Sequence, residues 1–88
     1  MSSLEWTTNV YMTSYQAGRE PTTYHELWRV GEDRTAWYNL PAASVRKIKD
    51  RMWELTFPDN GDGETMYFKT LKEAKAMGIA LVRMDDAV

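Results

Sequence analysis

The hydrophobic pattern of the chain changes its period at Thr70, and this change limits the folds open to it. Residues 64–69, ETMYFK, alternate polar and apolar side chains as a β-strand does. After Thr70 the apolar residues recur every three or four positions, which predicts an amphipathic helix over about 71–83. Thr70 and Glu73 form the T-x-x-E pattern of a capping box, so the helix begins directly after the strand. The sequence therefore predicts a C-terminal helix packed on one face of a sheet.

Gly78 lies on the apolar side of this predicted helix. A glycine inside a helix costs about 1 kcal/mol relative to alanine. Its position beside Ala74 is explained if the helix backbone runs close to a sheet or to a bulky ring, and the four tryptophans supply candidate rings. We therefore predict that Gly78 makes room where the helix meets the sheet.

The rest of the chain contains further segments with the alternation, threonines and aromatic residues typical of strands. These segments are 4–15, 23–30, 35–40 and 52–57. The polar stretch GEDR between the second and third segments predicts a hairpin that pairs 23–30 with 35–40. The stretch PDNGDG predicts a second hairpin that pairs 52–57 with 64–69, because Asp, Asn and Gly favour tight turns.

Residues 42–50 show a different spacing. Pro41 suits a first helical turn, and Val45, Ile48 and Met52 recur at three and four residues, which predicts a short helix over 42–50. The expected fold class is α+β, with an antiparallel sheet of about four or five strands and one C-terminal helix. We expect 1–88 to form a single domain with frayed ends at 1–3 and 85–88.

Composition narrows the classes of protein that this chain can belong to. The 88 residues suffice for one modest core, and the absence of cysteine excludes disulfides and thiolate metal sites. The longest apolar run, MGIALV, is far shorter than the ~20 residues that a membrane helix needs. Because MSSLEWTTNV has no basic start and no apolar block, we expect no secretory signal. We expect a cytoplasmic protein without a membrane partner.

Residues that could carry chemistry are few. His25 is the single histidine, and no serine lies in a recognisable nucleophile turn. The DNGDG stretch fails as an EF-hand loop, because the alignment places Pro58 first and Lys69 twelfth. We therefore expect no catalytic residue, no cofactor and no metal site, and thus a protein that is not an enzyme.

Two groups of residues predict a binding function. Because one helix covers only one face of an antiparallel sheet, aromatic side chains are expected on the other face, where they suit a protein partner. The candidate partner-binding residues are Tyr11, Tyr24, Trp28, Trp37, Tyr38 and Tyr67. The candidate nucleic-acid-binding residues are Arg46, Lys47, Lys49 and Arg51. Protein binding is the first expectation; nucleic-acid binding is the alternative, although the net charge of −2 disfavours it, and self-association as a homodimer is a minor alternative.

The stretch from 52 to 76, MWELTFPDNGDGETMYFKTLKEAKA, resembles a pattern of small bacteriophage accessory proteins and of the amino-terminal arm-DNA-binding domains of tyrosine-type integrases. The resemblance is carried by Phe68, Thr70, Glu73 and Ala74 in the pattern F-x-T-x-x-E-A. It implies a short sheet with one packed helix. It also implies either a phage-type accessory protein that acts on a host protein or, by likeness to the integrase domains, a sheet that reads DNA. The chain differs from those domains in its acidic balance and in its additional N-terminal strands.

Overall fold

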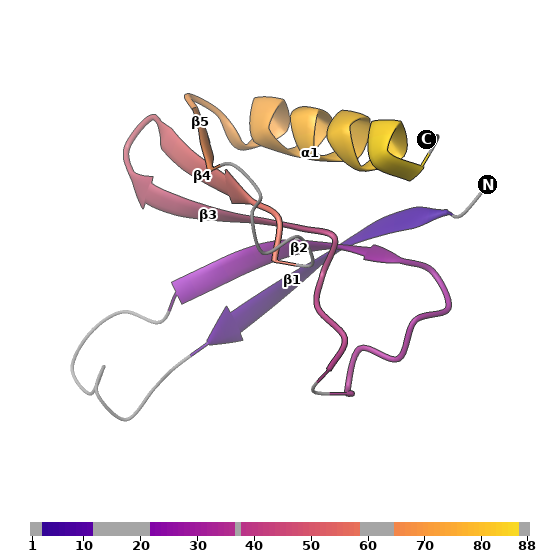
Figure 1. Ribbon diagram of the computed structural model, residues 1–88. Helices are drawn as coiled ribbons and strands as arrows, with labels where there is room; N and C mark the ends of the chain where they lie inside the picture. The colour runs from indigo at the N-terminus through magenta and orange to yellow at the C-terminus, as the bar shows by residue number, and fades with distance from the viewer. Residues whose placement is uncertain (1–2, 12–21, 37, 59–64, 87–88) are drawn as a thin grey trace.

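In the part of the chain that the structure describes, the fold is a five-stranded antiparallel sheet with one helix packed on it (Figure 1). The computed structural model describes residues 3–11, 22–36, 38–58 and 65–86. The elements are β1 (Leu4–Tyr11), β2 (Thr22–Arg29), β3 (Ala43–Lys49), β4 (Met52–Thr56), β5 (Met66–Phe68) and α1 (Leu71–Asp86). Each strand pairs with the next in sequence, so β1 and β5 form the two edges. The predicted α+β class, with its C-terminal helix on a sheet, is confirmed.

Helix α1 begins where the capping pattern predicts. The Thr70 hydroxyl accepts a hydrogen bond from the backbone N–H of Glu73 at 3.2 Å, which satisfies one of the donors that a helix start leaves unpaired. The Thr70 carbonyl accepts the first helical bond, from Ala74, at 3.2 Å. From this start α1 runs over β3, β4 and β5 (Figure 1).

The core lies between α1 and the sheet. Leu27, Val45 and Leu55, from three adjacent strands, are fully buried. At Gly78 a β-carbon would lie 3.3 Å from Leu55 Cδ1 and 3.4 Å from two atoms of the Trp6 ring. The prediction that Gly78 makes room for the sheet and a tryptophan is therefore confirmed.

The predicted helix over 42–50 is wrong, because these residues form β3. Val45 is fully buried, but Ile48 lies at an irregularity between Lys47 and Lys49 and is 42% exposed, so the apparent helical spacing marks no common face. Lys47 interrupts the alternation of polar and apolar residues that a strand usually shows. It occupies a position on the α1 side of the sheet, and its side chain extends over the Trp53 ring. A two-residue turn, in which Arg51 has a φ of 59°, then leads into β4.

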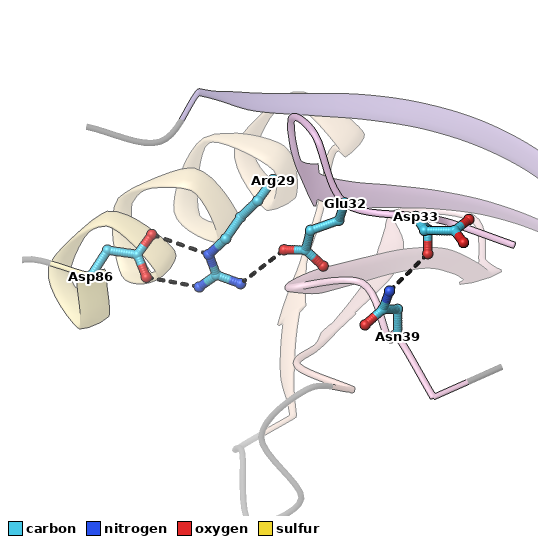
Figure 2. A network of polar contacts seen from close by, with 5 residues as sticks. All are labelled: Arg29, Glu32, Asp33, Asn39 and Asp86. Carbon is cyan, nitrogen blue, oxygen red and sulfur yellow. Dashed lines mark hydrogen bonds and ion pairs between the residues drawn. The ribbon is translucent and has the colours of Figure 1, made fainter. Parts of the chain in front are cut away.

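The predicted strand over 35–40 and its hairpin with 23–30 are also wrong. Strand β2 pairs with β3, and the Ala42 N–H donates to the Leu27 carbonyl at 2.8 Å. The described residues between 30 and 42 form a connection held together by Asp33. The carboxylate of Asp33 accepts hydrogen bonds from the backbone N–H and the hydroxyl of Thr35. The backbone carbonyl of Asp33 accepts one from the side-chain amide of Asn39 (Figure 2). Local hydrogen bonds to Asp33 thus replace strand pairing in this segment.

The ends of β1 and α1 also differ from their predicted positions. Strand β1 ends at Tyr11, and the rest of the predicted strand 4–15 lies outside the described residues. At the other terminus α1 continues to Asp86, within the end expected to fray. The Arg29 guanidinium donates two hydrogen bonds to the Asp86 carboxylate, at 2.7 and 3.3 Å, and fastens the last turn to β2 (Figure 2). These bonds hold the pKa of Asp86 below its ordinary value.

Candidate functional site

Of the predicted aromatic residues that the structure describes, Tyr24, Trp28 and Tyr67 occupy positions on the sheet face opposite α1, as expected, but only Tyr67 is exposed there. Trp28 is only 6% exposed, so its ring is not accessible to a partner, and Tyr24 is half-buried. Tyr38 and Tyr67 are 69% and 56% exposed, but Tyr38 lies on the β2–β3 connection and Tyr67 on the edge strand β5. Trp37 and the side chain of Tyr11 lie outside the described residues.

Beside these aromatic positions, the sheet face opposite α1 carries polar side chains that pair with one another. The side-chain amide of Asn9 donates to the carboxylate of Glu26 and to the Thr7 hydroxyl. Arg46 pairs with Glu54 at 2.8 Å on the same face. The hydrogen bond to Glu54 holds the pKa of Arg46 above its ordinary value, so this guanidinium is already engaged.

The four predicted nucleic-acid-binding residues are divided between different parts of the structure. Arg46 lies opposite α1, whereas Lys47 lies on the α1 side, 5.9 Å from the Trp53 ring centre and 3.2 Å from Asp50. Lys49 ends β3, and Arg51 is exposed in the turn that follows. The helix that would have given these cations one common face does not form.

Lys47 and Lys49 do share a cleft. This cleft has a volume of about 490 Å³ and lies at the ends of β2 and β3. Its lining comprises Thr22, Thr23, His25, Lys47, Ile48, Lys49, Asp50 and Trp53. His25 lies with its ring centre 6.1 Å from that of Trp53, and its Nδ1 is 3.1 Å from the Thr8 hydroxyl. The sequence offered no signal for this grouping, because it joins three strands.

His25 is expected to stay neutral at pH 7. Partial burial lowers its pKa from 6.5, and the nearby charge of Lys75 lowers it further. As the pH falls below about 6.5, the unfolded chain therefore takes up a proton before the folded chain does, and stability declines until the folded pKa is passed.

A pH titration of the His25 ring by NMR should give a midpoint below 6.5, and Lys75→Gln should raise it because the repelling charge is gone. The matched control is Lys72→Gln, which removes an exposed charge one helical turn earlier and should leave the midpoint unchanged. Equal shifts in both variants would contradict the assignment to Lys75.

The outer edge of β1 presents the most continuous set of binding groups in the described residues. The Val30 N–H donates to the Ser3 carbonyl at 2.9 Å, which makes Ser3 and Val30 a hydrogen-bonded pair of the β1–β2 ladder. Because such pairs alternate along antiparallel strands, Glu5, Thr7 and Asn9 direct their backbone groups toward β2. The residues that direct their N–H and C=O groups outward are Leu4, Trp6, Thr8 and Val10.

Within its described residues, strand β1 lacks lysine, proline, a bulge and short length, four features that often block strand pairing at an edge. Natural edge strands are protected by lysine, proline, bulges or short length. Strand β1 has eight residues, an unbroken register, no proline and no lysine. Its one charged residue, Glu5, pairs with Arg34 at 2.8 Å on the face opposite α1. The apolar Val10 is 59% exposed beside this open edge. The edge of β1 is therefore our candidate site.

Other kinds of site find less support in the described ranges. There, no group of three or more histidine and carboxylate side chains could hold a metal ion. Within the same part of the chain, no helix is long and apolar enough to cross a membrane. Comparison of the chain with protein-family models, curated proteins and solved structures found no match.

Proposed function

We propose that this chain is a small non-enzymatic protein-binding module that adds an extended strand of its partner to the edge of β1. The outward backbone groups of Leu4, Trp6, Thr8 and Val10 carry this proposal. Backbone hydrogen bonds supply affinity in strand addition, and side chains beside the edge supply selectivity.

The side chains beside the edge suit a partner strand with an apolar residue. On the α1 side of the sheet, the exposed Val10 offers an apolar contact and Thr8 offers a polar one. On the opposite side Glu5 is occupied by Arg34, and Asn9 by Glu26, so neither presents an unpaired group that a partner must satisfy. An incoming strand thus gains hydrogen bonds without burying an isolated charge.

Nucleic-acid binding stays an alternative. Lys47 and Lys49 share a cleft with Trp53, a combination that suits phosphates and bases. Arg46 and Arg51 lie apart from that cleft, however, and Arg46 is paired with Glu54. The basic residues therefore give this alternative less support than the β1 edge gives to protein binding.

The proposal predicts that Thr8→Pro abolishes partner binding. Proline at position 8 removes an outward N–H that only a partner would use, and it is tolerated on edge strands whose N–H faces solvent. The wild-type chain should capture proteins from a lysate of the native source, and Thr8→Pro should fail to retain them. The expected loss of binding free energy is at least about 1.4 kcal/mol, which lowers the affinity about tenfold.

The matched control for this experiment is Thr8→Ala. Alanine removes the same side chain, with its contact to His25, but retains the backbone N–H. Thr8→Ala should capture the same proteins as the wild type, and circular dichroism should show α1 intact in both variants. Equal capture by all three chains would refute strand addition at β1.

A further inference from the structure

We infer that the strand added to β1 is the β1 of a second copy, antiparallel to the first and centred on Thr7. This inference rests on the proposed function and names its partner. In this arrangement a two-fold axis passes between the two Thr7 residues and joins the two five-stranded sheets into one.

The register follows from which backbone groups point outward. Pairing centred on Thr7 places Leu4 opposite Val10 of the partner subunit, and Trp6 opposite Thr8 of the partner subunit. All four of these positions direct their N–H and C=O groups outward. Every outward group between Leu4 and Val10 therefore finds a backbone partner, as a hydrogen-bonded antiparallel ladder requires.

Neighbouring registers fit less well. If the pair were centred on Trp6, Val10 would lie opposite residue 2, and if it were centred on Thr8, Leu4 would lie opposite residue 12. Residues 2 and 12 are both outside β1. Centring it on Glu5 would bring two carboxylates directly opposite each other, which is unfavourable. The register centred on Thr7 alone uses the whole run from Leu4 to Val10.

The side chains also match across this register. The 59% exposed Val10 meets Leu4 of the partner subunit, so apolar surface is buried on the α1 side. On the other side Glu5 faces Asn9 of the partner subunit, an anion beside an amide and not beside a like charge.

The helix leaves room for the second copy. The backbone of helix α1 lies mainly over β3, β4 and β5 (Figure 1), and the helix reaches β1 at the Trp6 ring, which contacts it at Gly78 and Lys75. A two-fold axis perpendicular to the sheet places both helices on the same face but on opposite outer parts of the joined sheet.

A single cysteine tests this register, because the natural chain has none. In the new ladder the two Thr7 residues form a non-hydrogen-bonded pair with a Cα–Cα distance of about 4.5 Å, which is within the range of disulfides. Thr7→Cys incubated with oxidised glutathione should form a covalent dimer in high yield.

The matched control is Asn9→Cys, on the same strand and the same face of the sheet. In this register the two substituted positions are offset by four residues along the strands, about 13 Å, so their thiols cannot bridge. A mixture of Asn9→Cys with Glu5→Cys should cross-link instead, since these positions face each other. The yield of Thr7→Cys dimer should exceed that of Asn9→Cys dimer by about tenfold.

Light scattering on the cysteine-free wild type supplies a readout that needs no substitution in β1. The average mass of the wild-type chain should rise toward that of a dimer as its concentration increases. Thr8→Pro should remain monomeric at the same concentrations. A wild type that stays monomeric, or equal cross-linking of Thr7→Cys and Asn9→Cys, overturns the inference. If the monomeric wild type still captures another protein in a manner lost with Thr8→Pro, strand addition stands and only the second copy is refuted.

Discussion

Gly78→Leu is expected to destabilise the fold by about 3 kcal/mol. Even a β-carbon at this position would lie 3.3 Å from Leu55 Cδ1 and 3.4 Å from the Trp6 ring, so a whole leucine side chain must displace these neighbours. Overpacking of this kind forces neighbours from their preferred rotamers and typically costs about 1–3 kcal/mol or more. Urea unfolding, followed by the helical circular dichroism signal, measures the change.

The matched control for Gly78→Leu is Ala80→Leu. Ala80 is exposed on the outer side of the same helix, so its replacement tests the effect of a leucine without the contact. Surface substitutions of this kind usually change stability by less than about 0.5 kcal/mol. A loss below about 1 kcal/mol for Gly78→Leu, the lower end of the overpacking range, would show that α1 does not press against Leu55 and Trp6.

Leu55→Ala is expected to cost about 3 kcal/mol. Leu55 is fully buried, pairs with Val45 on one side and Met66 on the other, and reaches α1 at Gly78. Truncation of a buried leucine removes its transfer free energy and leaves a cavity, with typical losses of about 2–5 kcal/mol. Thermal and urea unfolding should both show the loss.

Ile48→Ala provides the comparison for Leu55→Ala. Ile48 is also an aliphatic residue on the sheet but is 42% exposed at the β3 irregularity, so its truncation should cost less than about 1 kcal/mol. Similar losses for the two variants would mean that the core is not centred between β4 and α1.

Prediction from the sequence succeeded where local patterns and tertiary packing agree. The alternation of 23–30 and 52–57, and the capping pattern at Thr70, correspond to β2, β4 and the start of α1. It failed at 42–50, where Lys47 takes a core-side position and an irregularity displaces Ile48. It failed again at 35–40, where hydrogen bonds to Asp33 favour a compact connection.

The candidate site was less accessible to sequence reasoning than the fold. Nothing within residues 4–11 distinguishes an edge strand from a central one, because that property depends on which strands lie beside it. The sequence shows many aromatic residues but not which of them are exposed: Trp28 is buried, whereas Tyr38 and Tyr67 are exposed, on the β2–β3 connection and on β5.

The amino-acid sequence alone determined the α+β class, the capped C-terminal helix and the need for a small residue at Gly78, because periodicity and capping act between residues close in the chain. Only the tertiary structure decided that β2 pairs with β3, that β1 lies at an edge, and that the basic residues separate onto different faces. These properties arise from contacts between residues distant in sequence, where strand order and register, and not local pattern, determine which groups are left for a partner.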